Sequence, residues 1–555
     1  MGTLKKQVVL VLVLAAVLGG VVLVRARDTG PVLSIGGRVV SPLGPVAGAT
    51  VKAVGGRQST QSDRDGVYDL AIFPPAYRPP LVAAGKPGFF NNLAYRGRGT
   101  TEQDVFLNPL YLADDPGYRF LSPATCFTCH GKVTRIWNQS KMSRATSNPR
   151  FLGMYYGEGP RGSRRGPGFR LDFPNSEGDC AKCHAPSAAA DPTRSWDPRR
   201  ILSSPRTEWP GVSCDYCHKV RTVVPSRRHP AGWAPVLERQ SPVRGRSILV
   251  FGPYPDTVVP PMAASYNPLF DQGRFCATCH SQSKRLPPGK KWDRAKVYSE
   301  REWAALGLGD DTLPLQTTYQ EWKSWQEGLA PGHPDKGKRC QFCHMSWQKK
   351  LLPYDNYLVE GMARRMWGIR RQPNQIRPHH FEGGTKAQLA GAVSLELSGS
   401  IQGRVLTIQA HVSNTNGGHW VPTGQPMRNL LLLVSARSLD EKPLKLLAGP
   451  RLPDWAGRGD PARGDYAGLP GFAFARVLAD DQGNLNVPSW RATRVAVDTR
   501  LRPKSTRVLT FRFQLPDPAD EPSVEAKLIY RPVVRPLAKA KGWPVKDILI
   551  TSKAW

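Results

Sequence analysis

The stretch CFTCHGKVTRIWNQSKM, residues 126–142, contains two cysteines three positions apart, with a histidine directly behind the second. The same pattern, C-x-x-C-H, occurs four more times, and it contains all ten cysteines of the chain. We number the copies motifs 1 to 5 in chain order. They are Cys126-Phe-Thr-Cys129-His130, Cys180-Ala-Lys-Cys183-His184, Cys214-Asp-Tyr-Cys217-His218, Cys276-Ala-Thr-Cys279-His280 and Cys340-Gln-Phe-Cys343-His344.

This spacing is that of a c-type haem attachment site. The two thiols bond covalently to the vinyl groups of the porphyrin, and the histidine behind them offers its imidazole to the iron. The sequence therefore predicts five covalently bound c-type haems. Their predicted proximal ligands are His130, His184, His218, His280 and His344.

Other uses of paired cysteines fit this pattern poorly. Four-thiolate zinc sites need two C-x-x-C units each, and five units do not pair evenly. A thioredoxin-like redox motif occurs once, near a βαβ pattern, rather than five times. Disulfide bonds would not require a histidine behind every second cysteine.

The composition indicates a loop-rich, basic chain of 555 residues, with 53 glycines, 52 prolines and a formal net charge of +33. Because each haem carries two propionates, five haems would lower this charge by about 10 and leave it strongly positive. We therefore expect acidic redox partner proteins. A nucleic-acid partner is not expected, because c-type haem is attached outside the cytoplasm.

The N-terminal residues 1–28 contain an apolar run, residues 8–24, with Lys5 and Lys6 before it and Arg25 and Arg27 directly after it. The run has the length of a short membrane span, and no small-residue cleavage site follows it. This favours an uncleaved signal anchor over a cleaved signal peptide. Both readings predict export with a periplasmic location, and the favoured one also predicts attachment to the inner membrane.

Three further domains are predicted. Residues 31–110 carry short alternating runs separated by Gly, Pro and Asp-Gly turns, and read as β. Residues 113–384 contain all five motifs. Residues 385–555 have no cysteine and return to alternating patterns such as RVLTIQAHV and RVLTFRFQL, which indicate a second β-sandwich.

Two segments resemble known families. GGRVVSPLGPVAGATVKAVGGRQSTQSDRDGVYDL, within residues 31–110, resembles the carboxypeptidase regulatory-like domain, an Ig-like β-sandwich. The phrases GVSCDYCHKV, TTYQEWKSW, RPHHFEGG and SNTNGGHWVPTG resemble the multihaem cytochrome c family related to hydroxylamine oxidoreductase and its tetrahaem electron acceptor. This second resemblance implies a mostly helical core of closely stacked haems. The expected fold is thus a mostly α, loop-rich pentahaem core between two β-sandwiches, with one N-terminal membrane-anchor helix.

The second resemblance also bears on the distal iron ligands. Met142 and Met262 stand where the family places ligand histidines, and thioether sulfur is an accepted haem ligand. Six of the eleven histidines lie outside the motifs, so the ligand pool suffices for five six-coordinate irons. One member of this set, His411, is expected to be an ordinary strand residue. The remaining candidates are His229, His333, His379, His380 and His419.

Electron transfer between respiratory redox partners is the leading functional prediction. The alternative is an oxidoreductase that acts on a small nitrogen or sulfur species at one open haem iron. Against it stand the ample ligand pool and the absence of any C-x-x-C-K variant. In a third reading, the two β domains dock the cytochrome into a larger respiratory or extracellular assembly.

Overall fold

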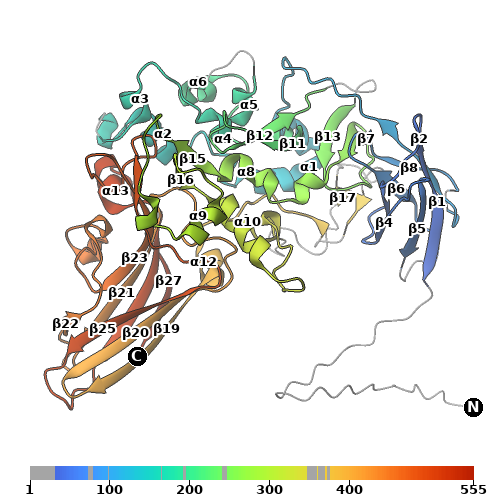
Figure 1. Ribbon diagram of the computed structural model, residues 1–555. Helices are drawn as coiled ribbons and strands as arrows, with labels where there is room; N and C mark the ends of the chain where they lie inside the picture. Colours follow the sequence, from blue (N-terminus) through green and yellow to red (C-terminus); the bar gives the residue numbers. More distant parts are fainter. Residues whose placement is uncertain are drawn as a thin grey trace, which may run out of the picture.

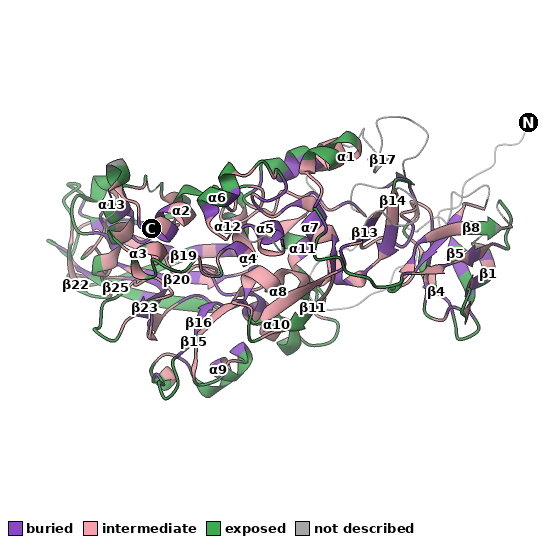
Figure 2. Cartoon of the chain, turned by 90° about the horizontal axis from the view of Figure 1, so that it is seen from above, coloured by how far each residue is buried: buried purple, intermediate pink, exposed green. Residues whose placement is uncertain are grey.

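The computed structural model describes residues 32–72, 79–97, 99–163, 166–191, 196–240, 247–346, 359–360, 369–371, 375–544 and 546–555. The molecule is elongated. An N-terminal β domain lies at one end, the cysteine-bearing segment lies in the middle, and a long β-sandwich lies at the other end (Figure 1; Figure 2).

The N-terminal domain is a set of short strands. β1 pairs with β5, and the main sheet has the order β2-β1-β9-β8-β6-β3-β4. Along β5 every second side chain is buried, namely Tyr68, Leu70 and Ile72, as expected of a strand with one face on a core. The strands are β1 Leu33–Ser41, β2 Gly44–Pro45, β3 Thr50–Ala53, β4 Ser59–Gln61, β5 Val67–Ile72, β6 Val82–Gly85, β7 Phe89–Phe90, β8 Asn92–Arg96, β9 Asp104–Phe106 and β10 Asn108–Pro109.

The buried Asn91 connects this domain to the middle segment. Its backbone N–H donates to the carbonyl of Ala264, and its side-chain amide donates to the carbonyl of Tyr254. Its side-chain oxygen accepts the N–H of Tyr266 at 2.8 Å. One asparagine thus satisfies backbone groups on both sides of the junction.

The middle segment is built from short helices. They are α1 Pro123–Asn138, α2 Pro149–Tyr156, α3 Phe169–Asp172, α4 Ala181–His184, α5 Pro186–Ala189, α6 Pro198–Ser203, α7 Cys214–His218, α8 Arg274–His280, α9 Glu300–Leu306, α10 Thr318–Gly328 and α11 Cys340–His344, with the 3₁₀ turns η1 Pro160–Gly162, η2 Pro268–Asp271 and η3 Arg294–Lys296. Most are a single turn or two, because only a few tens of residues separate successive motifs.

Two-stranded ladders fill the space between these helices. β11 Val220–Pro225 pairs antiparallel with β12 Trp233–Leu237, and β13 Ile248–Gly252 pairs parallel with β14 Met262–Tyr266. β15 Gln282–Arg285 pairs antiparallel with β16 Thr312–Gln316, and β17 Val359–Glu360 pairs with β18 Ile369–Arg370. These ladders give the haem-motif segment a mixed α and β character.

The C-terminal domain is a sandwich of two sheets, of order β19-β20-β25-β22 and β24-β23-β21-β26-β27. Its buried core includes Leu406, Ile408, Leu430, Phe511 and Leu528. The elements are α12 Lys386–Ala392, β19 Val393–Gln402, β20 Val405–Asn414, β21 Asn429–Arg437, β22 Lys445–Ala448, β23 Gly471–Ala479, β24 Arg494–Asp498, β25 Thr506–Gln514, β26 Ser523–Arg531, α13 Arg535–Lys541 and β27 Ile548–Ala554, with η5 Asp454–Ala456 and η6 Pro461–Arg463.

The predicted mostly α fold class is wrong, because the structure is 22% helix and 32% strand. The short ladders of the middle segment add to the strand content of the two β domains. The predicted membrane-anchor helix lies outside the residues that the structure describes. Among the described residues no helix is long and apolar enough to cross a bilayer, and residues 1–28, on which that prediction depends, lie outside them.

Candidate functional site

Every motif forms the same local structure, a helical turn that stops at or just behind its histidine. Four of these turns are α4, α7, α8 and α11, and in the longer α1 the backbone leaves the helical conformation at His130, with φ −107° and ψ 38°. Residues i, i+3 and i+4 share one face of a helix. The two cysteines and the histidine of each motif therefore lie on a common face.

The motifs lie close to one another, in an order that differs from the sequence. The thiol of Cys126 in motif 1 contacts that of Cys214 in motif 3. The thiol of Cys279 in motif 4 contacts that of Cys183 in motif 2. In addition, Cys276 of motif 4 contacts Cys340 of motif 5. Motif 4 is therefore next to both motif 2 and motif 5.

The ten cysteines are free thiols rather than disulfides. Burial raises the pKa of Cys180 and of Cys217 to about 12. At neutral pH these two thiols are neutral, unlike the low-pKa thiolates of disulfide oxidoreductases. These two thiols therefore suit a structural, covalent role better than a redox-active one.

The hydrogen bonds of the motif histidines orient their rings. Nδ1 of His184 lies 2.9 Å from the carbonyl oxygen of Ala145, and Nδ1 of His218 lies 2.7 Å from that of Phe251. Nδ1 of His344 lies 2.5 Å from the carbonyl oxygen of Glu382. Because a carbonyl only accepts, Nδ1 carries the proton and Nε2 keeps its lone pair. This is the arrangement of a histidine that binds a metal through Nε2.

His280 and His130 are held differently. Nδ1 of His280 contacts the side-chain amide of Gln316 at 3.0 Å, and burial lowers the pKa of His280 to about 4. His130 lies near His379, whose pKa it helps to lower. A neutral imidazole at physiological pH is available as a ligand.

Two pairs of histidine rings lie close to one another. His218 and His379 have ring centroids 6.5 Å apart and an interplanar angle of 32°, and His344 and His419 have centroids 6.2 Å apart at 13°. A metal–imidazole bond is about 2 Å long and the ring centre lies about 1 Å farther, so two rings on opposite sides of one metal should be about 6 Å apart. Both pairs have this spacing.

Burial favours the neutral form of both partner rings. It lowers the pKa of His379 to about 4 and also lowers the pKa of His419. Nδ1 of His419 lies 3.0 Å from the carbonyl oxygen of Trp420, so its proton is on Nδ1, as in the motif histidines. His419 thus reaches the cysteine-bearing segment from a loop that follows β20 in the C-terminal domain.

The other predicted ligand histidines are not in such pairs among the described residues. His380 has Nδ1 3.2 Å from the Pro378 carbonyl and Nε2 3.7 Å from Glu382. Nδ1 of His229, in the β11–β12 loop, accepts the N–H of Ala231 at 3.3 Å. Nδ1 of His333 accepts the N–H of Asp335 at 3.0 Å.

The two predicted methionine ligands are half-buried. Met142 lies in the turn after α1, where its carbonyl accepts the N–H of Val212, two residues before motif 3. Met262 begins β14, opposite Ile248. His411, predicted to be a strand residue, lies in β20 between Glu396 and Val508.

The apolar core around the motifs is small. The two largest clusters of buried apolar side chains lie in the β domains, and those around the motifs are small. A cavity of about 420 Å³ lies between α10 and the residues that precede motifs 4 and 5, with Arg274, Tyr319, Trp322 and Arg339 among its lining. The thiols and the oriented imidazoles together fit covalently bound haem.

Comparison with known proteins finds similarity in structure. No protein-family model matches the sequence, and no curated protein matches it, so both family resemblances stay predictions. The fold is similar to that of a penta-heme cytochrome c552 from Thermochromatium tepidum, with 20% sequence identity and a TM-score of 0.50. The match covers 80% of this chain and 100% of that chain. At this identity the likeness concerns the fold.

Proposed function

We propose that this protein is an extracytoplasmic pentahaem c-type cytochrome that passes electrons between redox partner proteins. The observation that carries the proposal is the contact between cysteines of different motifs, because haems attached to these thiols would lie close to one another. The penta-heme cytochrome c552 of similar fold supports it. C-type haems would supply one-electron redox chemistry, whose potentials the protein sets through ligands, burial and charge.

Residues of the chain would hold each iron from two sides. His218 and His379 are the proposed axial pair of motif 3, and His344 and His419 that of motif 5, because their rings have the spacing of two ligands on one metal. Carbonyl oxygens fix Nδ1 of three of these rings and leave Nε2 for the iron. The distal ligands of motifs 1, 2 and 4 are to be found among Met142, Met262, His229, His333 and His380.

The cysteine contacts indicate a path for electrons. Motif 1 contacts motif 3, and motif 4 contacts motifs 2 and 5, as described above. Cys217 of motif 3 lies near Cys279 of motif 4, which raises the pKa of Cys217. The proposed route therefore runs from motif 1 through motifs 3 and 4 to motif 5, with motif 2 beside motif 4.

The two ends of this route reach the surface. Phe127 in motif 1 is 42% exposed and Phe342 in motif 5 is 50% exposed, whereas Ala277 in motif 4 is fully buried. Arg135 lies over the ring of Phe127 at 5.1 Å, and Arg377 lies over that of Phe342 at 5.7 Å. An exposed apolar ring beside a cation suits an acidic partner protein. We propose that partners exchange electrons at these two surfaces.

A redox titration of the purified holoprotein tests this function. The expected result is five one-electron events and an all-low-spin ferric spectrum that cyanide and nitric oxide leave unchanged. A high-spin haem that binds cyanide or nitric oxide would instead indicate an open iron site, and would favour an oxidoreductase that acts on a small nitrogen or sulfur species.

A further inference from the structure

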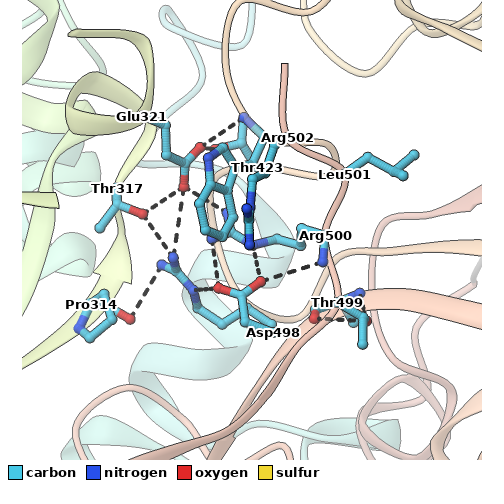
Figure 3. Close-up of polar contacts among 12 residues, drawn as sticks. Pro314, Thr317, Glu321, Thr423, Asp498, Thr499, Arg500, Leu501 and Arg502 are labelled. Atoms are coloured by element: carbon cyan, nitrogen blue, oxygen red, sulfur yellow. Dashed lines mark hydrogen bonds and ion pairs between the residues drawn. The ribbon is translucent and has the colours of Figure 1, made fainter. Parts of the chain in front are cut away.

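Four charged side chains with almost no exposure meet where α10 packs on the C-terminal domain (Figure 3). Glu321 belongs to the first turn of α10, and Arg476, Asp498 and Arg500 come from β23, the end of β24 and the residues after it. Their side chains are 0–4% exposed. Two carboxylates and two guanidinium groups give the cluster a net charge of zero.

Hydrogen bonds join the charged groups of this cluster. Arg500 donates to Glu321 at 2.7 Å and to both oxygens of Asp498 at 2.7 and 2.8 Å. Arg476 donates to Asp498 at 2.9 Å. Burial by itself would raise the pKa of Glu321 and of Asp498, but the two arginine charges outweigh it and lower both. Both carboxylates are therefore ionised at neutral pH.

The cluster holds the loop that carries His419. Glu321 accepts the backbone N–H of Trp420 at 3.2 Å and the hydroxyl of Thr423 at 2.9 Å. The guanidinium of Arg500 lies over the indole of Trp420 at 4.7 Å. The carboxylate thus contacts the chain at Trp420, directly after His419, and again at Thr423.

Three further contacts fix the same loop. The buried side chain of Asn414 donates to the carbonyl of His419 at 2.9 Å. Val421 exchanges two backbone hydrogen bonds with Leu501, next to Arg500, at 2.8 and 2.9 Å. A Cβ at Gly418 would lie 2.5 Å from the ring of Trp325, so that α10 also packs on the loop.

We infer that Glu321, held by Arg500, is a positioning residue that keeps the His419 ring opposite His344. The inference depends on the proposed function, because it takes His419 to be an axial ligand of the motif 5 haem. Glu321 touches neither ring and acts through the backbone at Trp420. Holding a ligand loop by hydrogen bonds to an ionised group should lower the free energy of the ligated state relative to states with His419 displaced.

Glu321→Gln in the holoprotein is the principal test. The amide keeps the size of the side chain but replaces one acceptor oxygen with a donor, so either Arg500 or the Trp420 N–H loses its partner. We expect the population with His419 displaced to rise by about 10- to 100-fold, the range that corresponds to loss of a hydrogen bond to a charged group. Ferric electron paramagnetic resonance should show a high-spin signal from one haem, and the ferrous protein should bind carbon monoxide there.

Thr423→Val and Thr423→Ser form a milder pair, in case Glu321→Gln does not fold. The valine removes a single hydroxyl that donates to Glu321, and the serine restores it. We expect carbon monoxide to bind faster in the valine variant and at the original rate in the serine variant. A merely structural role of Thr423 would change stability without changing the spin state.

Arg531→Met is the matched control. Arg531 is 1% exposed and pairs with Asp547 in the same domain, at 2.6 Å, but the described contacts of this pair do not include the His419 loop. The control should lose stability and keep every haem low-spin. A folded Glu321→Gln protein with the spin state and carbon monoxide binding of the parent would overturn the inference. If His419→Ala also left all haems unchanged, the assignment of His419 as a ligand would fail instead.

Discussion

The two histidine pairs have nearly the same distance between ring centroids but are held by different parts of the molecule. His379 follows motif 5 within the middle segment, whereas His419 comes from the C-terminal sandwich. The loop of His419 is tied to α10 by Glu321 and to the sandwich by Leu501. In our account one haem therefore depends on the packing of two domains, and the other depends on the middle segment alone.

Removal of each distal ring should produce the largest effects. We expect His419→Ala to convert one ferric haem completely from low-spin to high-spin, and His379→Ala to do so at a different haem. The double variant should then have two high-spin haems. Quantitative electron paramagnetic resonance of the oxidised protein checks this. One high-spin haem in the double variant would mean that both rings serve the same iron.

The next largest effect is expected from Asp498→Ala, which leaves two buried arginines without their shared carboxylate. Loss of one partner of a buried ion pair costs about 3–5 kcal/mol. We expect the free energy of unfolding in urea to fall by this amount, and the haem with His419 to become partly high-spin. The haem with His379 should keep its low-spin signal, and a change there as well would contradict independent anchoring.

Low pH should selectively weaken the anchoring of the His419 loop. The pKa of Asp498 in the folded protein lies well below its usual value of 3.8, because the charges of Arg500 and Arg476 outweigh burial. Its contribution is complete above pH 4 and is lost as the pH falls toward the folded pKa. When the high-spin signal is monitored during an acid titration, one haem should thus become high-spin before the other. Simultaneous loss of low-spin character at the two haems would count against this.

The smallest effect concerns a second contact between the same two regions. Nζ of Lys541 in α13 is buried and donates to the carbonyl of Gly153 in α2 at 2.9 Å. Burial lowers the pKa of Lys541 to about 8, so between pH 8 and 10.5 the unfolded chain binds more protons and stability should rise with pH. For Lys541→Met, the free energy of unfolding in urea should not show this rise with pH. An equal slope in both proteins would mean that another group causes it.

Local patterns indicated local structure better than the overall architecture. The motif spacing alone defines the helical turn that places Cys126, Cys129 and His130 on one face, and the structure contains that turn five times. Strand content in the middle segment was not predicted, because stretches such as VRTVVP in β11 pair only with a nearby partner strand, β12. Strand propensity alone therefore did not indicate these ladders, because strand formation depends on the tertiary context.

The positioning cluster could not be read from the sequence. Glu321 lies in the phrase TTYQEWKSW, where nothing local marks the glutamate. Its partner Arg500 is 179 residues away in sequence. Likewise, a choice between His379 and His380 required coordinates, because adjacent histidines differ only in which ring meets His218.

The central claim is covalent attachment of five haems through the ten motif cysteines. Intact-mass measurement of the purified protein after acid–acetone extraction tests it most directly. We predict that the red colour stays with the polypeptide and that its mass exceeds that of the bare chain by five haem groups. A colourless chain at the mass of the polypeptide alone would contradict the account.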